Sequence, residues 1–216
     1  MDIIVVIFEA KMGEKFVNYQ VKWVSQHHVA QIVERITRNQ AYVSPSKNGW
    51  ITVYDQTSEE FNRDYIRYFV QELSTKLSTT VFTFMVYRGL NFVYLLYECG
   101  EIIDEFDNDT EGEIFGEEYA RDIYINRFQG DSNKLLKYCT TSTNQQSISE
   151  FLVSCRQRDV EYLGQNAAYE LAYLLGMDIK RATIGYSYFE DNNLYVATEF
   201  YIEEAEQFLL VHHTEK

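Results

Sequence analysis

The residues best suited to chemistry in this 216-residue chain are carboxylates gathered in one stretch, residues 101–122. Ten acidic side chains stand there against one basic side chain, Arg121, so this stretch supplies a formal charge of −9 out of −14 for the whole chain. Carboxylates at this density can bind a cation, exchange protons with a substrate, or face a basic protein. The sequence therefore places the first functional hypotheses here.

Within this stretch, residues 107–118 resemble the twelve-residue calcium loop of EF-hand proteins. Oxygen-bearing side chains occupy loop positions one, three, five and twelve, and Gly112 occupies position six. Alternate side chains at this spacing can converge on one cation, and the glycine allows the sharp bend that the loop needs. The resemblance implies four side-chain ligands for Ca²⁺, namely Asp107, Asp109, Glu111 and Glu118.

Two departures from the calcium-loop pattern favour a different use of the same residues. Position five holds Glu111, which is longer than the usual ligand, and the segment that enters the loop is predicted to be a strand rather than a helix. No second loop of this kind is present to pair with it. We therefore expect an acidic surface that faces a protein partner, with four carboxylates in contact: Asp104, Glu105, Glu113 and Glu117.

Other candidate sites have weaker patterns. The four histidines form two doublets, 27–28 and 212–213, and one histidine from each could bind zinc with a carboxylate only if the doublets met in space. Cys99, Cys139 and Cys155 lack a local catalytic signature, and no nucleotide-binding, zinc-protease or serine-hydrolase motif occurs. A carboxylate- or metal-dependent hydrolase stays the alternative to a binding protein.

Composition limits the partners and the location. With 19 basic residues against 33 acidic ones, the chain lacks the basic clusters that attract nucleic acid or an anionic membrane, so we expect neither as a partner. Three irregularly spaced cysteines indicate reduced thiols and a cytoplasmic protein. No apolar run approaches the roughly 20 residues of a membrane helix. The 18 tyrosines suit half-buried positions and protein interfaces.

The N-terminal half alternates strand and helix patterns. Helices are predicted over 26–38, with Ser25 as N-cap, and over 58–77, where Thr57 and Glu60 form a capping box. We expect 3–8 and 17–23 to pair with each other. The full set of strands predicted in this half is 3–8, 17–23, 41–44, 50–54, 80–87, 91–98 and 101–105.

The C-terminal half is richer in helix patterns. A short helix is predicted near Leu135, a second from a capping box of Ser147 and Glu150 to about residue 157, and a third over 165–175, closed by Gly176. A hairpin is predicted from strands 182–189 and 194–201, and the tail 203–213 could form a last helix.

These patterns predict an α+β fold: a mixed or antiparallel sheet with hairpins, covered by two amphipathic helices and followed by a helix-rich part with a final β-hairpin. We expect two parts, 1–130 and 131–216, packed as one globular unit. We interpret the chain as a non-enzymatic protein that binds a basic protein, such as a toxin-neutralising immunity protein.

Overall fold

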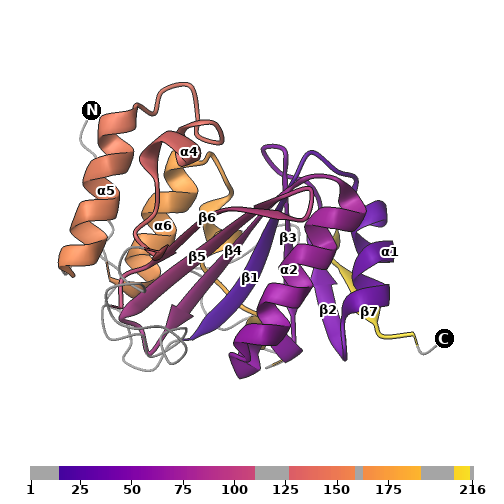
Figure 1. The fold of residues 1–216 in the computed structure, drawn as a ribbon. Helices are drawn as coiled ribbons and strands as arrows, with labels where there is room; N and C mark the ends of the chain where they lie inside the picture. The colour runs from indigo at the N-terminus through magenta and orange to yellow at the C-terminus, as the bar shows by residue number, and fades with distance from the viewer. Residues whose placement is uncertain (1–14, 110–126, 159–162, 191–206, 215–216) are drawn as a thin grey trace.

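The computed structural model describes residues 15–109, 127–158, 163–190 and 207–214. These residues contain one seven-stranded antiparallel sheet in the order β6-β5-β4-β1-β3-β2-β7 (Figure 1). The fold is therefore α+β, as predicted. Its strands are β1 (Phe16–Lys22), β2 (Gln40–Val43), β3 (Trp50–Asp55), β4 (Thr80–Tyr87), β5 (Asn91–Glu98), β6 (Glu101–Asp107) and β7 (Leu209–His212).

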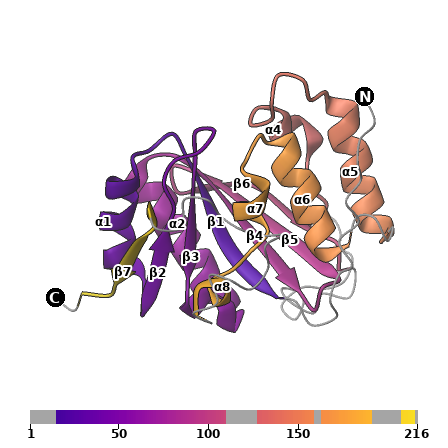
Figure 2. The same cartoon turned by 180° about the vertical axis from the view of Figure 1, so that it is seen from behind.

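Helices cover both faces of the sheet. Helices α1 and α2 pack on one face, and Figure 2 shows α6, α7 and α8 from the opposite side. No helix within the described ranges is long and apolar enough to cross a membrane. The helical segments are α1 (Gln26–Ile36), η1 (Thr57–Glu60), α2 (Arg63–Leu77), α4 (Ser132–Leu136), α5 (Gln145–Gln157), α6 (Gly164–Leu174), α7 (Ile179–Ala182) and α8 (Ser187–Glu190).

Strand β4 shows why the sheet needs helices on both sides. Successive strand residues point to opposite faces, and β4 is apolar or aromatic except at Thr80 and Thr83. Val81 and Met85 pack into the core under α1 and α2, whereas Phe82 and Phe84 pack into the core under α5 and α6. The buried strand therefore joins two separate cores.

The predicted strands over 80–87, 91–98 and 101–105 are confirmed as the β4-β5-β6 meander. Helix α1 begins after Ser25, whose hydroxyl accepts a hydrogen bond from the backbone N–H of His28, as predicted. Strand β1 has β3 and β4 on its two sides, so the pairing that we predicted with residues 3–8 is not the pairing of this strand. Residues 3–8 themselves lie outside the described residues.

Two predicted helix starts are wrong. Thr57 and Glu60 lie in the short η1 segment, and Phe61 then takes a left-handed backbone conformation with φ of 58°. Helix α2 begins after Asn62, whose side chain accepts from the N–H of Tyr65. Since any short polar side chain can cap a helix, asparagine displaced the predicted capping box.

Helix α5 likewise begins at an asparagine and not at the predicted capping box. Its N-cap is Asn144, which accepts a hydrogen bond from the backbone N–H of Ser147, so the predicted Ser147 and Glu150 box lies inside the helix. Helix α6 ends as predicted, because Gly176 has φ of 69° and the N–H of Met177 returns to the carbonyl of Ala172.

The final hairpin differs from the prediction. Residues 182–189 contain the end of α7 and most of α8, so the first predicted strand is wrong. The second predicted strand, 194–201, lies outside the described residues. The predicted tail helix is also wrong, because residues 209–212 form β7 and pair with β2. Strand β7 thus belongs to the same sheet as the N-terminal strands, and helices α5 and α6 pack against that sheet.

Candidate functional site

Strand β6 carries the first half of the acidic stretch and lies at one edge of the sheet (Figure 1). Residues 128–130 cover part of this edge: the N–H of Asp107 donates to the carbonyl of Phe128, and the N–H of Gly130 donates to the carbonyl of Glu105. Asp104 and Glu105 are adjacent, so their side chains point to opposite faces of the sheet. The two carboxylates therefore meet different surroundings.

Glu105 lies on the α2 face between two arginines. Both oxygens accept hydrogen bonds from Arg67 at 3.0 and 3.1 Å, and both accept from Arg127 at 3.0 and 3.1 Å. Burial by itself would raise the pKa of Glu105, but the hydrogen bonds and charges of the two arginines hold the pKa below its ordinary value. Glu105 is 6% exposed. It therefore joins α2, β6 and the start of the 127–132 segment.

Asp104 lies on the face of α4 and α5. Its Oδ2 accepts hydrogen bonds from the hydroxyl of Tyr94 at 2.7 Å and from the backbone N–H of Asp131 at 2.9 Å. The ammonium of Lys134 is 3.9 Å from Oδ1. Burial raises the pKa of Asp104, and these hydrogen bonds and Lys134 oppose the shift only in part.

Asp104 and Glu105 are thus bonded within the chain and do not form an exposed acidic surface in this structure. The other two residues predicted to contact a partner, Glu113 and Glu117, lie outside the described residues. Contact of these four residues with a partner stays a prediction.

The predicted calcium loop begins at the end of β6. Asp107 and Asp109 are both buried, and Oδ1 of Asp107 accepts a hydrogen bond from the N–H of Asp109 at 2.7 Å. The entering segment is a strand, as the sequence predicts. Glu111 and Glu118 lie outside the described residues, so the set of four ligands stays a prediction. Within the described part of the chain, no group of three or more suitable side chains is placed to hold a metal ion.

The two histidine doublets lie at opposite ends of α1. The amide of Gln26, beside the first doublet, donates to the carbonyl of Gln207, whereas the N–H of His213 donates to the carbonyl of Asn39 beyond the other end of the helix. A helix of 11 residues is about 16 Å long. This separation is too large for two zinc ligands, so the zinc hypothesis that joined the doublets is wrong.

The surroundings of the three cysteines give little support for nucleophilic catalysis. Cys155 is fully buried, and burial raises the pKa of Cys139 to about 11, although Lys22 opposes the shift. Cys99 is exposed at the turn between β5 and β6. A thiol with a raised pKa is a weak nucleophile at neutral pH, so Cys139 is poorly suited to nucleophilic catalysis.

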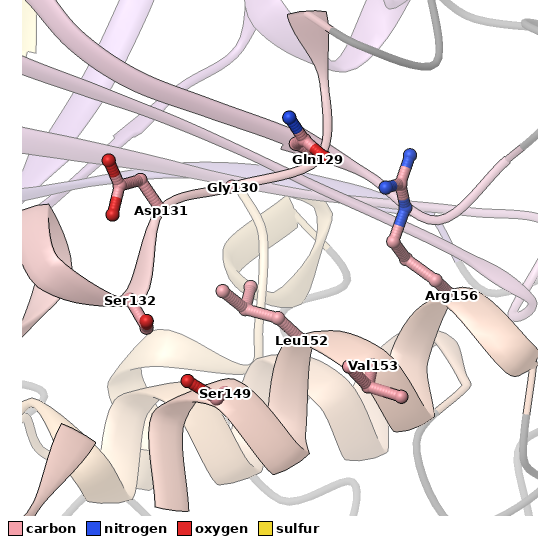
Figure 3. Close-up of a pocket in the computed structure, with 8 residues that line it drawn as sticks. All are labelled: Gln129, Gly130, Asp131, Ser132, Ser149, Leu152, Val153 and Arg156. Carbon is pink, nitrogen blue, oxygen red and sulfur yellow. The ribbon is translucent and has the colours of Figure 1, made fainter. Parts of the chain in front are cut away.

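A groove beside β6 was not predicted from the sequence. It has a volume of about 330 Å³ and lies between residues 129–132 and helix α5 (Figure 3). Gly130, one of its lining residues, has φ of 70°, and a Cβ there would lie 2.6 Å from the Tyr94 hydroxyl, so no larger residue fits. The lining residues are Gln129, Gly130, Asp131, Ser132, Ser149, Leu152, Val153 and Arg156.

Two carboxylates on the other side of the molecule were also missed. Asp55 is fully buried and accepts hydrogen bonds from the hydroxyls of Thr37 and Ser58 and from the N–H of Ser58. Glu59 accepts from the N–H of Ser187, and burial raises its pKa to about 7. Ser58 is close in the sequence, but Thr37 is 18 residues from Asp55 and Ser187 is 128 residues from Glu59, so the local sequence gave little signal. Asp55 joins β3 to the end of α1 and to η1, and Glu59 joins η1 to α8.

Comparisons with family models, with curated proteins and with solved structures find no match to this chain. We therefore infer the function from the geometry of the described residues and from the distribution of charge.

Proposed function

We propose that this protein is a non-enzymatic binding protein that engages a basic protein through acidic residues, in the manner of an immunity protein that neutralises a basic toxin. One observation carries the proposal. Residues 101–122 hold ten acidic side chains and one basic side chain, Arg121, which gives a formal charge of −9 out of −14 for the whole chain. Most of the excess negative charge therefore belongs to one short segment of the sequence.

The structure of β6 supports two different roles for the carboxylates of the acidic stretch. Glu105 is paired with two arginines and Asp104 accepts hydrogen bonds from Tyr94 and from the N–H of Asp131, so both side chains are engaged within the chain. The sequence then continues to Glu113 and Glu117, which have no basic neighbour before Arg121. In this proposal those two glutamates contact the partner, and complementary charge speeds association and selects a basic surface.

The same proposal includes a cytoplasmic location. Its support is that the three cysteines are irregularly spaced and form no disulfide bond with one another, as is usual for proteins of a reducing compartment.

Charge-reversal variants test the proposal. The wild-type protein, the double variant E113K/E117K and the control E60K/D64K would be immobilised and exposed to lysate of the source cells at about 50 mM salt. Glu60 and Asp64 are exposed residues near α2, so the control changes net charge equally at another place. We expect a basic protein to be retained by the wild type and the control and lost from E113K/E117K.

The captured protein would then be purified and its affinity measured by calorimetry at rising salt. Affinity that is independent of salt, or equal retention by all three proteins, would refute a charge-driven interaction.

Calcium binding by the 107–118 loop and carboxylate-dependent hydrolysis stay predictions of lower rank. A calcium site would raise the melting temperature when Ca²⁺ is added, because a ligand that binds only the folded state stabilises it. Mg²⁺ at the same concentration is the matched control.

A further inference from the structure

At the edge of the sheet, the backbone N–H and C=O of Gln129 have no hydrogen-bond partner among the described residues. Gln129 forms an antiparallel bridge with Phe106, and the bonds on either side of it use the carbonyl of Phe128 and the N–H of Gly130. In an antiparallel ladder, the residue between two such bonds turns its own N–H and C=O away from the partner strand. Both backbone groups of Gln129 therefore face outward, and Gln129 is exposed.

This outward-facing residue lies in the wall of the groove beside α5. Leu152 and Val153 give the groove an apolar side, and Val153 is 52% exposed. In Figure 3, Asp131 and Arg156 lie toward opposite ends of the labelled residues, with Leu152 between them. The Asp131 carboxylate accepts one hydrogen bond, from the N–H of Asn133, and has capacity for more. Main-chain, apolar and charged groups thus line the same groove.

From this arrangement we infer that the groove binds an extended polypeptide segment of a partner, added antiparallel to the sheet edge at Gln129. One residue of the guest exchanges two hydrogen bonds with the backbone of Gln129. This is the geometry of β-strand addition, in which main-chain bonds give affinity and pockets for alternate side chains give specificity. All described strand pairs in this sheet are antiparallel, so the guest continues the existing order.

The register predicts the chemistry of the guest. Side chains that lie directly opposite each other share a face, so the guest residue paired with Gln129 points toward α5 and contacts Val153. An apolar β-branched residue suits this position. The residue two places earlier in an antiparallel guest lies opposite Asp131, and a lysine or arginine suits that carboxylate. The inferred guest therefore contains a three-residue sequence: a basic residue, then any residue, then a β-branched apolar residue.

This inference extends the proposed function but does not depend on Glu113 or Glu117. Main-chain hydrogen bonds form in any sequence and resist salt, whereas attraction between exposed charges is screened. The two ideas can therefore fail separately.

The test uses the pentapeptide acetyl-Lys-Thr-Val-Thr-Ser-amide and an analogue with N-methylvaline, which lacks the central N–H donor. Each would be titrated into ¹⁵N-labelled full-length protein at about 0.5 M salt, with backbone amide shifts followed by NMR. We expect a saturable shift of the Gln129 amide with the first peptide. Loss of one main-chain bond should weaken binding about three- to tenfold for the N-methyl analogue.

Protein variants complete the experiment. V153D should weaken binding by a similar factor because it places a carboxylate at the apolar position, whereas Y68D changes an exposed aromatic residue on the other face of the sheet and should bind as the wild type does. The E113K/E117K variant should also bind the peptide unchanged. Equal affinity for both peptides, an unchanged affinity of V153D, or no saturable shift up to about 10 mM peptide would overturn the inference.

Discussion

The two faces of strand β6 shift the pKa values of adjacent carboxylates in opposite directions. On the α2 face, two arginines hold the pKa of Glu105 below its ordinary value. On the α5 face, burial raises the pKa of Asp104, which accepts from a tyrosine hydroxyl and a backbone N–H and has a lysine only at 3.9 Å. Charge compensation therefore depends on the face on which a residue lies and not on its position in the sequence.

This difference separates a structural side of the strand from a side that is open to a guest. The arginine-rich face closes around Glu105 and fixes α2 to the sheet edge. The opposite face, which meets Asp104, leads through Asp131 into the groove. Four predictions test how far this contrast extends.

The largest effect is expected for E105Q. A glutamine offers one acceptor oxygen to the four N–H donors of Arg67 and Arg127, and its own NH₂ group faces one of the guanidinium groups. We expect the free energy of unfolding to fall by about 3 kcal/mol, measured by urea denaturation. E101Q, at an exposed position of the same strand, is the control. An equal loss in both variants would show that the arginine cluster contributes nothing specific.

A smaller loss is expected for D104N. Both hydrogen bonds to Asp104 reach the same oxygen, so the carbonyl of an asparagine can accept them both. Removal of the charge also removes its burial cost. We expect the free energy of unfolding to fall by about 1 kcal/mol in the same measurement. A loss as large as that of E105Q would mean that the two faces do not differ.

The pH dependence of these two losses should have opposite signs. The folded-state pKa of Glu105 is below the ordinary value of 4.5, so its stabilisation is present above pH 4.5 and disappears as the pH falls through the folded-state pKa. The folded-state pKa of Asp104 is above 3.8, so its ionisation costs stability as the pH rises through the folded-state pKa. Between about pH 3 and 7, the cost of E105Q should therefore grow and that of D104N should shrink. Parallel curves would contradict the contrast.

The smallest effect is expected for K134A. The side chain of Lys134 is 46% exposed and its ammonium is 3.9 Å from Asp104, so solvent screens the pair. We expect a change in unfolding free energy within about 0.5 kcal/mol, measured as above. A loss of more than about 1 kcal/mol would place a strong ion pair on the face that we describe as weakly compensated.

The elements that sequence reasoning predicted well are those whose signals are local. Strands β4, β5 and β6 follow one another through tight turns, and a run of apolar residues marks each of the first two. Residues 182–189, three of which are aromatic, were predicted as a strand. Their rings bury instead against the sheet: Phe189 stacks on Tyr42 at 4.4 Å and lies 5.0 Å from Tyr54. Aromatic residues are common in strands because strands bury them, but here these side chains pack against the sheet from a helical segment.

The candidate site was less accessible to sequence reasoning. The density of acidic residues is visible in the sequence, but the partners of Glu105 are 38 and 22 residues away, at Arg67 and Arg127. The groove needs the 127–132 segment and α5 to lie side by side, which no local pattern encodes. Charge density therefore marks a region of the sequence but does not give the direction in which each carboxylate points.

Strand β7 is synthesised last, which leaves its partner strand unpaired for a time. It pairs with β2, and the register joins Gln40 to His212. While the ribosome makes the chain, β1 to β6 are complete long before β7 emerges, and the outer edge of β2 lacks this neighbour throughout that interval. An unpaired edge can recruit a foreign strand. Nascent chains arrested before residue 209 should therefore bind chaperones more strongly than chains released after residue 212.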